Sequence, residues 1–439
     1  MVQVSTNSLE HYWMPFTANR DFKAEPRLFT KGEGVYYWNH KGEKVFDGTA
    51  GLFCSALGHG RREIVDAVHK QLLEMDYAPS FNSGHPIAFE AAARVARITP
   101  PGLKKIFFGN SGSEAVETAI KIALAYHRVR GEGQRQRFVS RERAYHGVNM
   151  GGVSLAGIMR NREAFGAVMP GVVHMRHTWD PNNRFVKGQP DKGAELADDL
   201  QRACDLYGGQ TIAACIVEPI AGSTGILVPP KGYLERLREI CTKNGILLIF
   251  DEVICGFGRT GKAFAAQTFD VIPDLMVMAK ALTNAVQPMG AVAAKDEIHD
   301  AIVNAAPDKT IEFFHGYTYS AHPGACAACI ATQDIFEREK TFEKAAALSP
   351  YFLDAVFSLK DLPIVSDIRG FGLLAGFDVK PASAPGLRGY EIMKKLFHAG
   401  LHIKFTGDAG CISPALIVEK SQIDEMVGLL REVLGKIKP

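Results

Sequence analysis

The sequence predicts an α/β protein in which a large domain, built on a doubly wound and mostly parallel sheet, precedes a smaller α+β domain. Apolar runs such as 246–250 and 275–279 show no alternation of polar and apolar residues, as expected of parallel strands that are covered on both faces. These runs alternate along the chain with segments of helical periodicity. Such alternation of strand and helix implies a parallel sheet with helices on both faces.

The elements of the large domain can be placed in order. Apolar residues recur at helical spacing in 62–75 and 89–98, and a strand at 105–108 leads through a tight loop into a helix at 114–128. Further strands are expected at 137–139, 211–217, 246–250 and 275–279, with a helix at 233–242 that is closed by Asn244-Gly245. The polar stretch 180–191 is expected to be an exposed excursion.

The two ends of the chain have different patterns. The first sixty residues are rich in aromatic residues, and 41–43 are expected to form a hairpin turn between short strands. An alanine-rich helix from Pro323 is followed by strands at 364–368, 372–379 and 401–405 and by helices from Arg388 and Ile423. We therefore expect an N-terminal segment at 1–60 that packs with the small domain, a large domain at 61–330 and a small domain at 331–439.

The composition indicates an ordinary globular protein. The chain has 439 residues, of which 46% are hydrophobic, and its net charge of +2 provides no field that would gather nucleic acid or an anionic membrane. No apolar run approaches the roughly 18 residues of a membrane span, and the N-terminus lacks the basic-then-apolar pattern of a secretory signal. We therefore expect a soluble, cytoplasmic protein that acts on small molecules, with no nucleic-acid or membrane partner.

Eight cysteines are scattered along the chain, several of them inside apolar runs. This pattern is typical of reduced thiols in the core of a cytosolic protein. The one C-x-x-C pair, Cys326 and Cys329, lies in an alanine-rich segment with no second pair or histidine at zinc spacing. We therefore expect no metal site.

Two charged residues stand at the ends of buried apolar runs. Asp251 follows the run at 246–250, and Lys280 follows the run at 275–279. Open α/β sheets place their binding and catalytic sites at the carboxyl ends of the strands. Either residue alone could be a solvated residue that closes a strand, so the interpretation depends on what else the chain offers.

A turn between a strand and a helix offers an anion site. The strand at 105–108 is followed by Gly109-Asn110-Ser111-Gly112-Ser113, and Ser111 with Glu114 fits a capping box. The free N–H groups and the dipole of a helix N-terminus favour a phosphate. The turn matches neither the G-x-G-x-x-G fingerprint of dinucleotide folds nor a Walker loop, so a single phosphate is favoured over both. An ordinary capped helix is the alternative.

A phosphate site, a strand-end carboxylate, a strand-end lysine and the loop Tyr145-His146-Gly147 together match the needs of pyridoxal phosphate. A carboxylate beside the ring nitrogen keeps the ring protonated, so that the ring can accept electrons when the substrate loses its Cα proton. An aromatic side chain can lie against the ring. A lysine amine can bond to the aldehyde and then act as the base that moves the proton.

The same residues belong to motifs that resemble those of class III aminotransferases, and the resemblance runs through nearly the whole chain. The motifs are Asn110-Ser111-Gly112-Ser113-Glu114-Ala115, Tyr145-His146-Gly147, Glu218-Pro219-Ile220, Phe250-Asp251-Glu252-Val253, Gly256-Phe257-Gly258-Arg259-Thr260-Gly261, Ala279-Lys280 and Thr318-Tyr319-Ser320-Ala321-His322-Pro323. Two further stretches, His11-Tyr12-Trp13-Met14-Pro15-Phe16-Thr17 and Gly48-Thr49-Ala50-Gly51, resemble the omega-amino acid:pyruvate branch. The resemblance implies PLP fold type I, which is the fold of aspartate aminotransferase.

The resemblance implies a role for the residues around the cofactor ring. Lys280 would be the Schiff-base lysine, and Asp251 would be the partner of the ring nitrogen. Tyr145 would stack above the ring and Val253 would pack below it. Glu218 would lie beside Asp251 and orient it.

Other matching residues concern the phosphate and the second subunit. Gly112 and Ser113 would hold the phosphate through backbone and hydroxyl groups, next to Ser111, and His146 would belong to the cofactor-binding loop. In this family the threonine that matches Thr318 reaches the phosphate of the other subunit. The resemblance therefore implies a homodimer with shared active sites, or a tetramer built from two such dimers.

Substrate specificity is expected to depend on residues far from the cofactor motifs. By resemblance, Trp13, Phe16 and Phe53 would shape the pocket for the side chain of the amine. Phe53 stands where relatives have a tryptophan, which should leave a roomier pocket. Lys404 stands where many relatives carry the arginine that grips the substrate carboxylate, so the charge is kept and the bidentate fork is lost. Lys404 as a solvated strand residue is the alternative.

We expect a ping-pong transaminase that moves nitrogen from an omega-amino acid, such as β-alanine, or from an amine to pyruvate. Alternatives with the same fold are another donor (GABA, a diamine, taurine or an aryl-alkyl amine), 2-oxoglutarate as acceptor, an aminomutase or a decarboxylating transaminase. A non-catalytic module that binds pyridoxal phosphate is a more distant alternative. A nicotinamide dehydrogenase is disfavoured, because the glycine fingerprint is missing.

Overall fold

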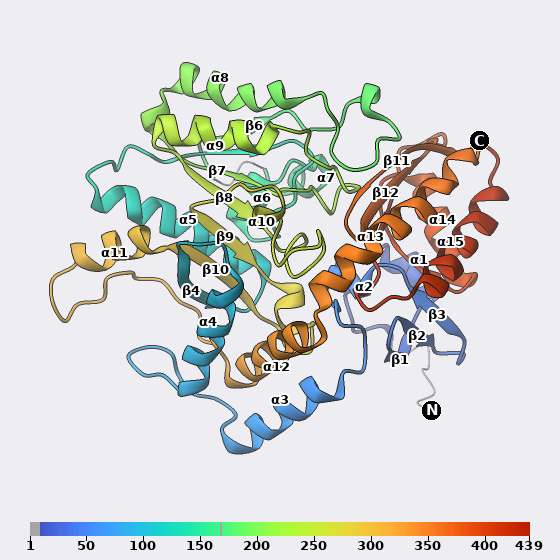
Figure 1. The fold of residues 1–439 in the computed structure, drawn as a ribbon, viewed down its shortest axis with the longest axis horizontal. Coiled ribbons are helices and arrows are strands. Elements are labelled where there is room, and N and C mark those ends of the chain that lie inside the picture. The colour runs from blue at the N-terminus through green and yellow to red at the C-terminus, as the bar shows by residue number, and fades with distance from the viewer. Residues whose placement is uncertain (1–8, 167–168) are drawn as a thin grey trace.

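The computed structural model describes residues 9–166 and 169–439, and a seven-stranded sheet lies at the centre of the described part (Figure 1). In spatial order its strands are β4 (Leu103–Gly109), β10 (Gly290–Lys295), β9 (Leu275–Met278), β8 (Leu247–Asp251), β7 (Ile212–Val217), β5 (Arg137–Arg141) and β6 (Val172–Met175). The pairs from β9 through β6 are parallel, whereas β10 runs antiparallel to both of its neighbours. The prediction of a mostly parallel sheet is therefore confirmed.

Helices cover both faces of this sheet, and β8 shows why its sequence does not alternate. Leu247 and Ile249 belong to the apolar cluster around α5 (Gly112–Val129), which also includes residues of α11 (Asp296–Ala305). Leu248 and Phe250 belong to the larger cluster, which includes residues of α8 (Asp198–Tyr207) and α9 (Tyr233–Asn244). Because both sides of the strand face apolar side chains, every position from Leu247 to Phe250 is apolar.

The strand and helix that bear the predicted anion site lie close to the expected positions. Helix α5 begins at Gly112, and Ser111 is its N-cap, since the hydroxyl of Ser111 accepts a hydrogen bond from the N–H of Glu114 at 3.2 Å. The second half of the predicted capping box is wrong. The Glu114 carboxylate accepts from the backbone N–H of Asn110 at 2.6 Å and from its side-chain amide at 2.9 Å, one residue before the N-cap.

Two short helices, α1 (Asn19–Ala24) and α2 (Ala50–Phe53), belong to the N-terminal residues. The remaining helices between 62 and 340 surround the sheet or connect its strands. They are α3 (Arg62–Glu74), α4 (Pro86–Ile98), α6 (Met150–Leu155), α7 (Met159–Arg162), α10 (Ala265–Thr268) and α12 (Pro323–Glu339), with short 3₁₀ turns at Pro181–Asn183, Ala194–Ala197, Gly209–Thr211 and Lys280–Thr283. Helix α12 packs against α3 and α4 and leads into the C-terminal region. Six of the twelve residues in 180–191 are exposed, but the stretch is not a free excursion, because Lys187 forms a β-bridge with Gly370 and the N–H of Phe185 donates to Asp367.

The C-terminal region contains a four-stranded antiparallel sheet with helices against it. Its strands, in spatial order, are β11 (Val365–Phe371), β12 (Leu374–Val379), β15 (Ala409–Ile412) and β14 (Lys404–Thr406). The helices are α13 (Thr341–Phe357), α14 (Leu387–His398) and α15 (Lys420–Gly435), with a 3₁₀ turn at Ser358–Asp361. The sequence did not predict β15 or α13.

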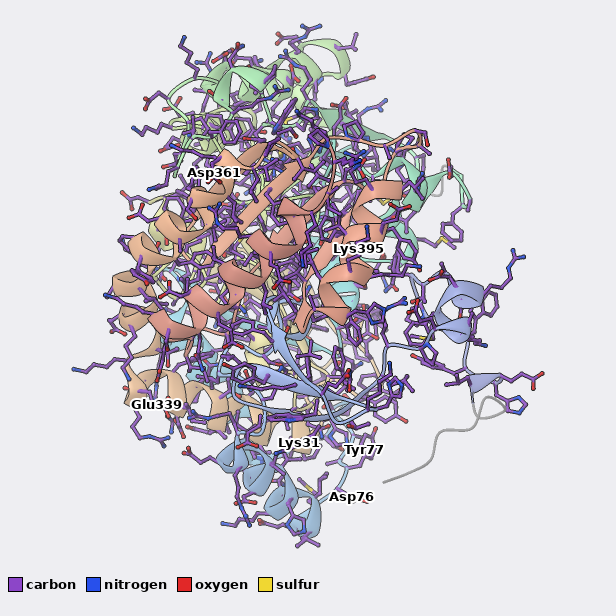
Figure 2. The ribbon with its side chains drawn as sticks, turned by 90° about the vertical axis from the view of Figure 1, so that its right-hand side faces the viewer. Lys31, Asp76, Tyr77, Glu339, Asp361 and Lys395 are labelled. Atoms are coloured by element: carbon purple, nitrogen blue, oxygen red, sulfur yellow. The ribbon has the colours of Figure 1, made fainter. Side chains whose placement is uncertain are left out.

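The N-terminal residues form a separate sheet that takes one strand from the C-terminal region. Strands β1 (Phe29–Glu33), β2 (Tyr36–Asn39) and β3 (Lys44–Asp47) are joined by β13 (Leu401–His402), which pairs in parallel with β3. The single strand expected at 401–405 is therefore two short strands in different sheets. In Figure 1 the blue N-terminal strands lie beside the red C-terminal helices, and Figure 2 shows Lys31 of β1 below Lys395 of α14.

Three further findings concern the described residues as a whole. None of their helices combines the length and apolar character needed to cross a bilayer. Across 9–166 and 169–439, no three His, Cys, Asp or Glu side chains are grouped so that they could hold a metal ion. Seven of the eight cysteines are buried, Cys326 and Cys329 among them, within α12.

Candidate active site

A cavity of about 110 Å³ lies where the carboxyl ends of β8 and β9 meet the N-terminus of α5. It brings together residues that are up to 168 positions apart, because parallel strands deliver their carboxyl ends to one edge of the sheet. Eight of the residues singled out in the sequence line it: Gly112, Ser113, Tyr145, His146, Glu218, Asp251, Val253 and Lys280. Gly147, Ile254 and Ala279 complete the lining.

The carboxylate of Asp251 is held by two hydrogen bonds. His146 donates through Nδ1 to Oδ2 at 2.8 Å, and the backbone N–H of Val253 donates to Oδ1 at 3.1 Å. Both Asp251 and His146 are buried, and the other ring nitrogen of His146, Nε2, has no partner among the described residues. The two donors hold the carboxylate of Asp251 in one orientation at the cavity.

Glu218 supports the loop that carries Tyr145. It is fully buried, and its two oxygens accept hydrogen bonds from the backbone N–H groups of Tyr145 at 3.0 Å and Gly222 at 2.9 Å. Burial raises the pKa of Glu218, and the nearby Asp251 carboxylate raises it further, whereas the neighbouring His146 lowers it. Glu218 therefore fixes the backbone of Tyr145 at the edge of the cavity.

The N-terminus of α5 forms one wall of the cavity. The first N–H groups of a helix have no partner within the helix, and the dipole there favours negative charge. The hydroxyl of Ser113 accepts from the N–H of Val148 at 3.1 Å, which ties the loop to the helix. A Cβ atom on Gly147 would lie 2.6 Å from this hydroxyl, so only glycine permits such an approach.

Lys280 begins the 3₁₀ turn that follows β9. Its backbone lies in the left-handed region, with a φ of 54 degrees, which is uncommon for a residue with a Cβ atom. The carbonyl of Lys280 accepts a hydrogen bond from the N–H of Ala285 at 3.3 Å, which closes the turn. This conformation brings the side chain of Lys280 to the cavity that Asp251 also lines.

These groups fit pyridoxal phosphate. The amide groups at the start of α5 and the hydroxyl of Ser113 suit a phosphate, and the Asp251 carboxylate suits a protonated ring nitrogen. Gly112 leaves room for Val253, whose two methyl groups would lie 3.2 Å from a Cβ atom at position 112. The amine of Lys280 supplies the group that an aldehyde needs.

Several residues named from the sequence do not line this cavity. Ser111 caps α5 next to it. Thr318 is exposed, and its carbonyl accepts a hydrogen bond from the hydroxyl of Tyr77 at 3.0 Å. Trp13 and Phe16 are 89% and 77% exposed, in the N-terminal segment that projects from the body of the molecule in Figure 2.

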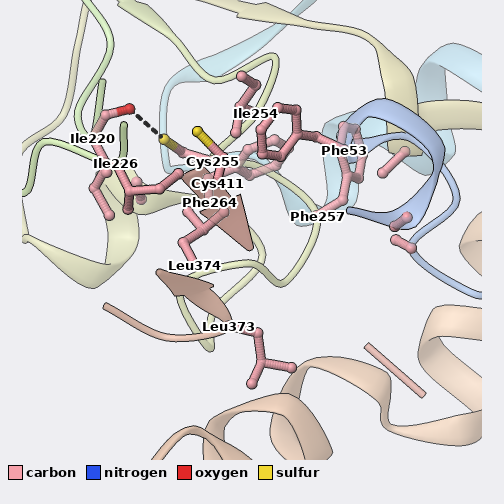
Figure 3. Close-up of a cluster of buried hydrophobic side chains, with 14 of the residues drawn as sticks. Phe53, Ile220, Ile226, Ile254, Cys255, Phe257, Phe264, Leu373, Leu374 and Cys411 are labelled. Atoms are coloured by element: carbon pink, nitrogen blue, oxygen red, sulfur yellow. Dashed lines mark hydrogen bonds between the residues drawn. The ribbon is translucent and has the colours of Figure 1, made fainter. Parts of the chain in front are cut away.

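Phe53 is buried and does not line the cavity. It belongs to the same apolar cluster as Ile254 and Phe257, which Figure 3 shows, and of these three only Ile254 lines the cavity. Its backbone has a φ of 65 degrees, so it also occupies the left-handed region.

Lys404 is half-buried, and its amine is engaged within the chain. Nζ donates to the backbone carbonyl of Ser223 at 2.6 Å and to the hydroxyl of Thr406 at 2.5 Å. Burial lowers the pKa of Lys404, and the positive charge of Lys280 lowers it further, whereas Cys411 and Glu218 oppose the shift. These charge interactions place Lys404 near the cavity, although it is not among the lining residues.

Three lining residues were not singled out as site residues from the sequence. Gly147 belongs to the motif Tyr145-His146-Gly147. Its role is to allow the close approach of the loop to Ser113, which depends on the folded structure. Ile254 and Ala279 are neighbours in the chain of residues that were named. Ala279 belongs to the motif Ala279-Lys280, whereas Ile254 lies three positions after Asp251 and directly follows Val253.

Comparisons with known proteins place these features in a wider context. A family model described as aminotransferase class-III matches residues 17–434. The chain is 54% identical to the omega-aminotransferase of Caulobacter vibrioides over the full length of both. It is 44% identical to the beta-alanine–pyruvate aminotransferase of Pseudomonas aeruginosa, over 98% of this chain and 96% of that relative. The omega transaminase of Pseudomonas jessenii, solved in complex with PMP, superposes with a TM-score of 0.91 at 31% identity, over 98% of this chain and 96% of that one.

Proposed function

Because this chain belongs to the class-III aminotransferase family, we propose that it moves an amino group from an omega-amino acid such as β-alanine, or from another amine, to pyruvate. The observation that carries the proposal is one cavity lined by Lys280, by Asp251 and by the N-terminus of α5. The names of the two relatives support the choice of substrates. The enzyme depends on pyridoxal phosphate, as class-III aminotransferases do.

The residues at the start of α5 would hold the cofactor at one end. When bound, pyridoxal phosphate supplies an aldehyde that takes up the donor's amino group and a ring that holds the electron pair left by the departing proton. Gly112 and Ser113 would bind its phosphate through free N–H groups and the hydroxyl, with Ser111 fixing the first turn. Tyr145 and Val253, which both line the cavity, would pack against the two sides of the ring.

Asp251 would hold the ring nitrogen in its protonated form. Its carboxylate is oriented by His146 and by the N–H of Val253, so little reorganisation is needed when charge moves in the reaction. Glu218 would keep Tyr145 in place through the backbone hydrogen bond. These groups are part of a rigid sheet edge, which favours accurate positioning.

Lys280 would carry the proton. Its amine would remove the proton from the amine-bearing carbon of the donor and return a proton at the cofactor's aldehyde carbon. The reverse sequence with pyruvate would deliver the amino group as alanine. Since donor product leaves before pyruvate reacts, the two half-reactions would follow ping-pong order.

Specificity would depend on Phe53 and Lys404. Lys404 would bind the donor's carboxylate as a point charge, which is weaker and less directional than an arginine fork. Phe53, which belongs to the same apolar cluster as Ile254, would set the room available to the donor's side chain.

We further propose a homodimer, or a tetramer of two dimers, in which each site takes residues from both subunits. The high exposure of Trp13 and Phe16 supports this, since large apolar side chains in one projecting segment suggest a covering partner. In this assembly Trp13 and Phe16 would help to form the pocket, and Thr318 would reach the phosphate of the partner's cofactor. The small net charge and the scattered cysteines support a cytoplasmic location.

The test is a donor and acceptor panel with mass balance. Wild-type enzyme is incubated with β-alanine and pyruvate, and alanine is measured against the oxo product. One alanine per oxo product supports the proposal; an isomer formed without pyruvate consumption would show an aminomutase, and no turnover with bound cofactor would show a non-catalytic module. Replacing pyruvate by 2-oxoglutarate, and β-alanine by an amine without a carboxylate, identifies the substrates that are preferred.

A further inference from the structure

The turn that carries Lys280 contains three non-glycine residues in the left-handed region. The φ angles are 54 degrees at Lys280, 51 degrees at Asn284 and 60 degrees at Ala285. Residues with a Cβ atom avoid this conformation unless the surrounding structure enforces it, and asparagine tolerates it best. The turn that presents the amine is therefore held in place by something outside its own backbone.

The side chain of Asn284 provides such a contact. It is only 4% exposed, and its Oδ1 accepts a hydrogen bond from the N–H of Leu57 at 2.8 Å, while its Nδ2 donates to the carbonyl of Gly58 at 2.9 Å. Both partners are backbone groups of one segment that lies more than 220 positions earlier in the chain. Two bonds to adjacent residues fix the orientation of the amide as well as its distance.

The segment that Asn284 contacts is anchored at its other end by Asp47. The buried carboxylate of Asp47 accepts hydrogen bonds from the N–H groups of Thr49 and Gly51 and lies 2.7 Å from Nε2 of His59. Between these anchors lies Phe53, itself in the left-handed region and packed in the cluster that includes Ile254. Hydrogen bonds thus connect the segment 47–59 internally and also join it to the turn that carries Lys280.

We propose that Asn284 is a positioning residue, which couples the turn that carries Lys280 to the segment that carries Phe53. The proposal rests on the role of Lys280 in the proposed function. The consequence is that the proton-transferring amine and the segment that carries Phe53 keep a fixed relation to each other. Misplacing a reacting group by about 1 Å can cost a factor of about 100 in rate, so loss of this contact should reduce catalysis without removing any group that touches substrate.

Asn284→Gly is the most direct test, because glycine adopts the left-handed backbone freely and removes only the two side-chain bonds. We expect the holoenzyme variant to retain its cofactor through gel filtration and to show a kcat for β-alanine and pyruvate that is reduced at least about tenfold. In hydrogen exchange, uptake should rise both in 280–286 and in 55–60. Asp270→Gly, a change at an exposed left-handed residue after α10, is the matched control and should alter neither.

A second variant covers the case in which the glycine variant is unstable. Asn284→Asp keeps an acceptor for the N–H of Leu57 and loses the donor to the carbonyl of Gly58, so its kcat should lie between those of the wild type and the glycine variant. The proposal is overturned if both variants have a kcat within twofold of the control, or if exchange rises in 280–286 alone. Lys280→Ala distinguishes failure of the proposed function from failure of the role of Asn284. Full activity of Lys280→Ala would refute the proposed function. An inactive Lys280→Ala together with an unimpaired Asn284→Gly would refute only the role of Asn284.

Discussion

His146 donates a hydrogen bond to Asp251 across 2.8 Å, and both side chains are buried at the edge of the central sheet. His146 comes from the loop that also carries Tyr145, whereas Asp251 ends β8. The pair therefore ties the loop on one side of the cavity to the strand on the other. It also leaves the Asp251 carboxylate oriented by two donors, of which the second is the N–H of Val253.

Asp251→Asn should separate cofactor binding from catalysis. The amide has nearly the shape of the carboxylate, so we expect the variant to retain pyridoxal phosphate after gel filtration. Without the negative charge of the carboxylate, the protonated form of the ring nitrogen is no longer stabilised, and kcat should fall by at least about 100-fold. Bound cofactor is measured by absorbance and kcat by alanine formation.

The matched control is Asp274→Asn, which changes another buried aspartate at the amino end of β9. Asp274 pairs with Arg238 and Lys295, each at 2.7 Å, away from the cavity. Its loss should cost about 1–3 kcal/mol of stability and leave the kcat of the folded enzyme within a few-fold of wild type. A normal kcat for Asp251→Asn would remove the proposed role of the carboxylate.

Lys404→Arg should improve the binding of donors that carry a carboxylate. Arginine can form two parallel hydrogen bonds to a carboxylate, so the KM for β-alanine should fall by up to about tenfold. The KM for an amine of similar length without a carboxylate should not change. If the variant leaves the KM for β-alanine unchanged, Lys404 is no carboxylate binder.

The same residue should give the donor reaction a pH dependence. Burial lowers the pKa of Lys404, so its charge is lost at a lower pH than that of an exposed lysine. We therefore expect the KM of β-alanine, divided by that of the amine without a carboxylate, to rise as the pH is raised through this lowered pKa. In Lys404→Arg, which stays charged, the ratio should remain constant.

Mixed dimers should show whether Thr318 serves the partner's site. Lys280→Ala and Thr318→Ala subunits, carrying different tags, are coexpressed, and the mixed dimer is isolated. If Thr318 reaches across, one site in the mixed dimer has both lesions and the other has none, so the dimer should show about half of the wild-type kcat and bind one cofactor tightly. If Thr318 acts in its own subunit, no site is intact, and the activity would be half that of the Thr318→Ala homodimer.

Glu252 should make stability fall as the pH rises. Burial raises the pKa of Glu252 from 4.5 to about 7, although the N–H groups of Ala265 and Ala266 donate to its oxygens at 2.9 and 2.7 Å. Between these two pH values the folded protein binds more protons than the unfolded chain, so stability is lost as the pH increases. The Tm of the wild type minus the Tm of Glu252→Gln should therefore decrease from pH 5 to pH 8. A difference that is constant over this range would contradict the raised pKa.

The sequence was most informative about features that depend on residues close together in the chain. Asp251 and Lys280 were recognisable because a charged residue at the end of an apolar run can be identified from the sequence alone. Parallel strands then bring such ends together. Ser111 was recognisable as an N-cap because capping depends on a few neighbouring residues. Five of the seven strands of the large sheet were predicted for the same reason, since each face repeats a local pattern, whereas β6, β10, α8 and α11 were not predicted.

What the sequence could not predict depends on contacts between distant segments. The strand expected at 401–405 is divided because Leu401 pairs with Phe46 while Lys404 pairs with Cys411. Strand β15 was missed because 409–412 is short and has small residues at its first two positions, and its position is set by its neighbour strands. The contact of Asn284 with Leu57 leaves no local signal, since neither residue type marks a site by itself.

The most direct test of the account is a single-turnover experiment with the two substrates added in sequence. Wild-type enzyme, free of pyruvate, is mixed with β-alanine, separated from the excess by gel filtration and then given pyruvate. We expect one oxo product per active site in the first step and one alanine per site in the second, with neither step in Lys280→Ala. Product that forms only when both substrates are present together, or normal turnover by Lys280→Ala, would contradict the account.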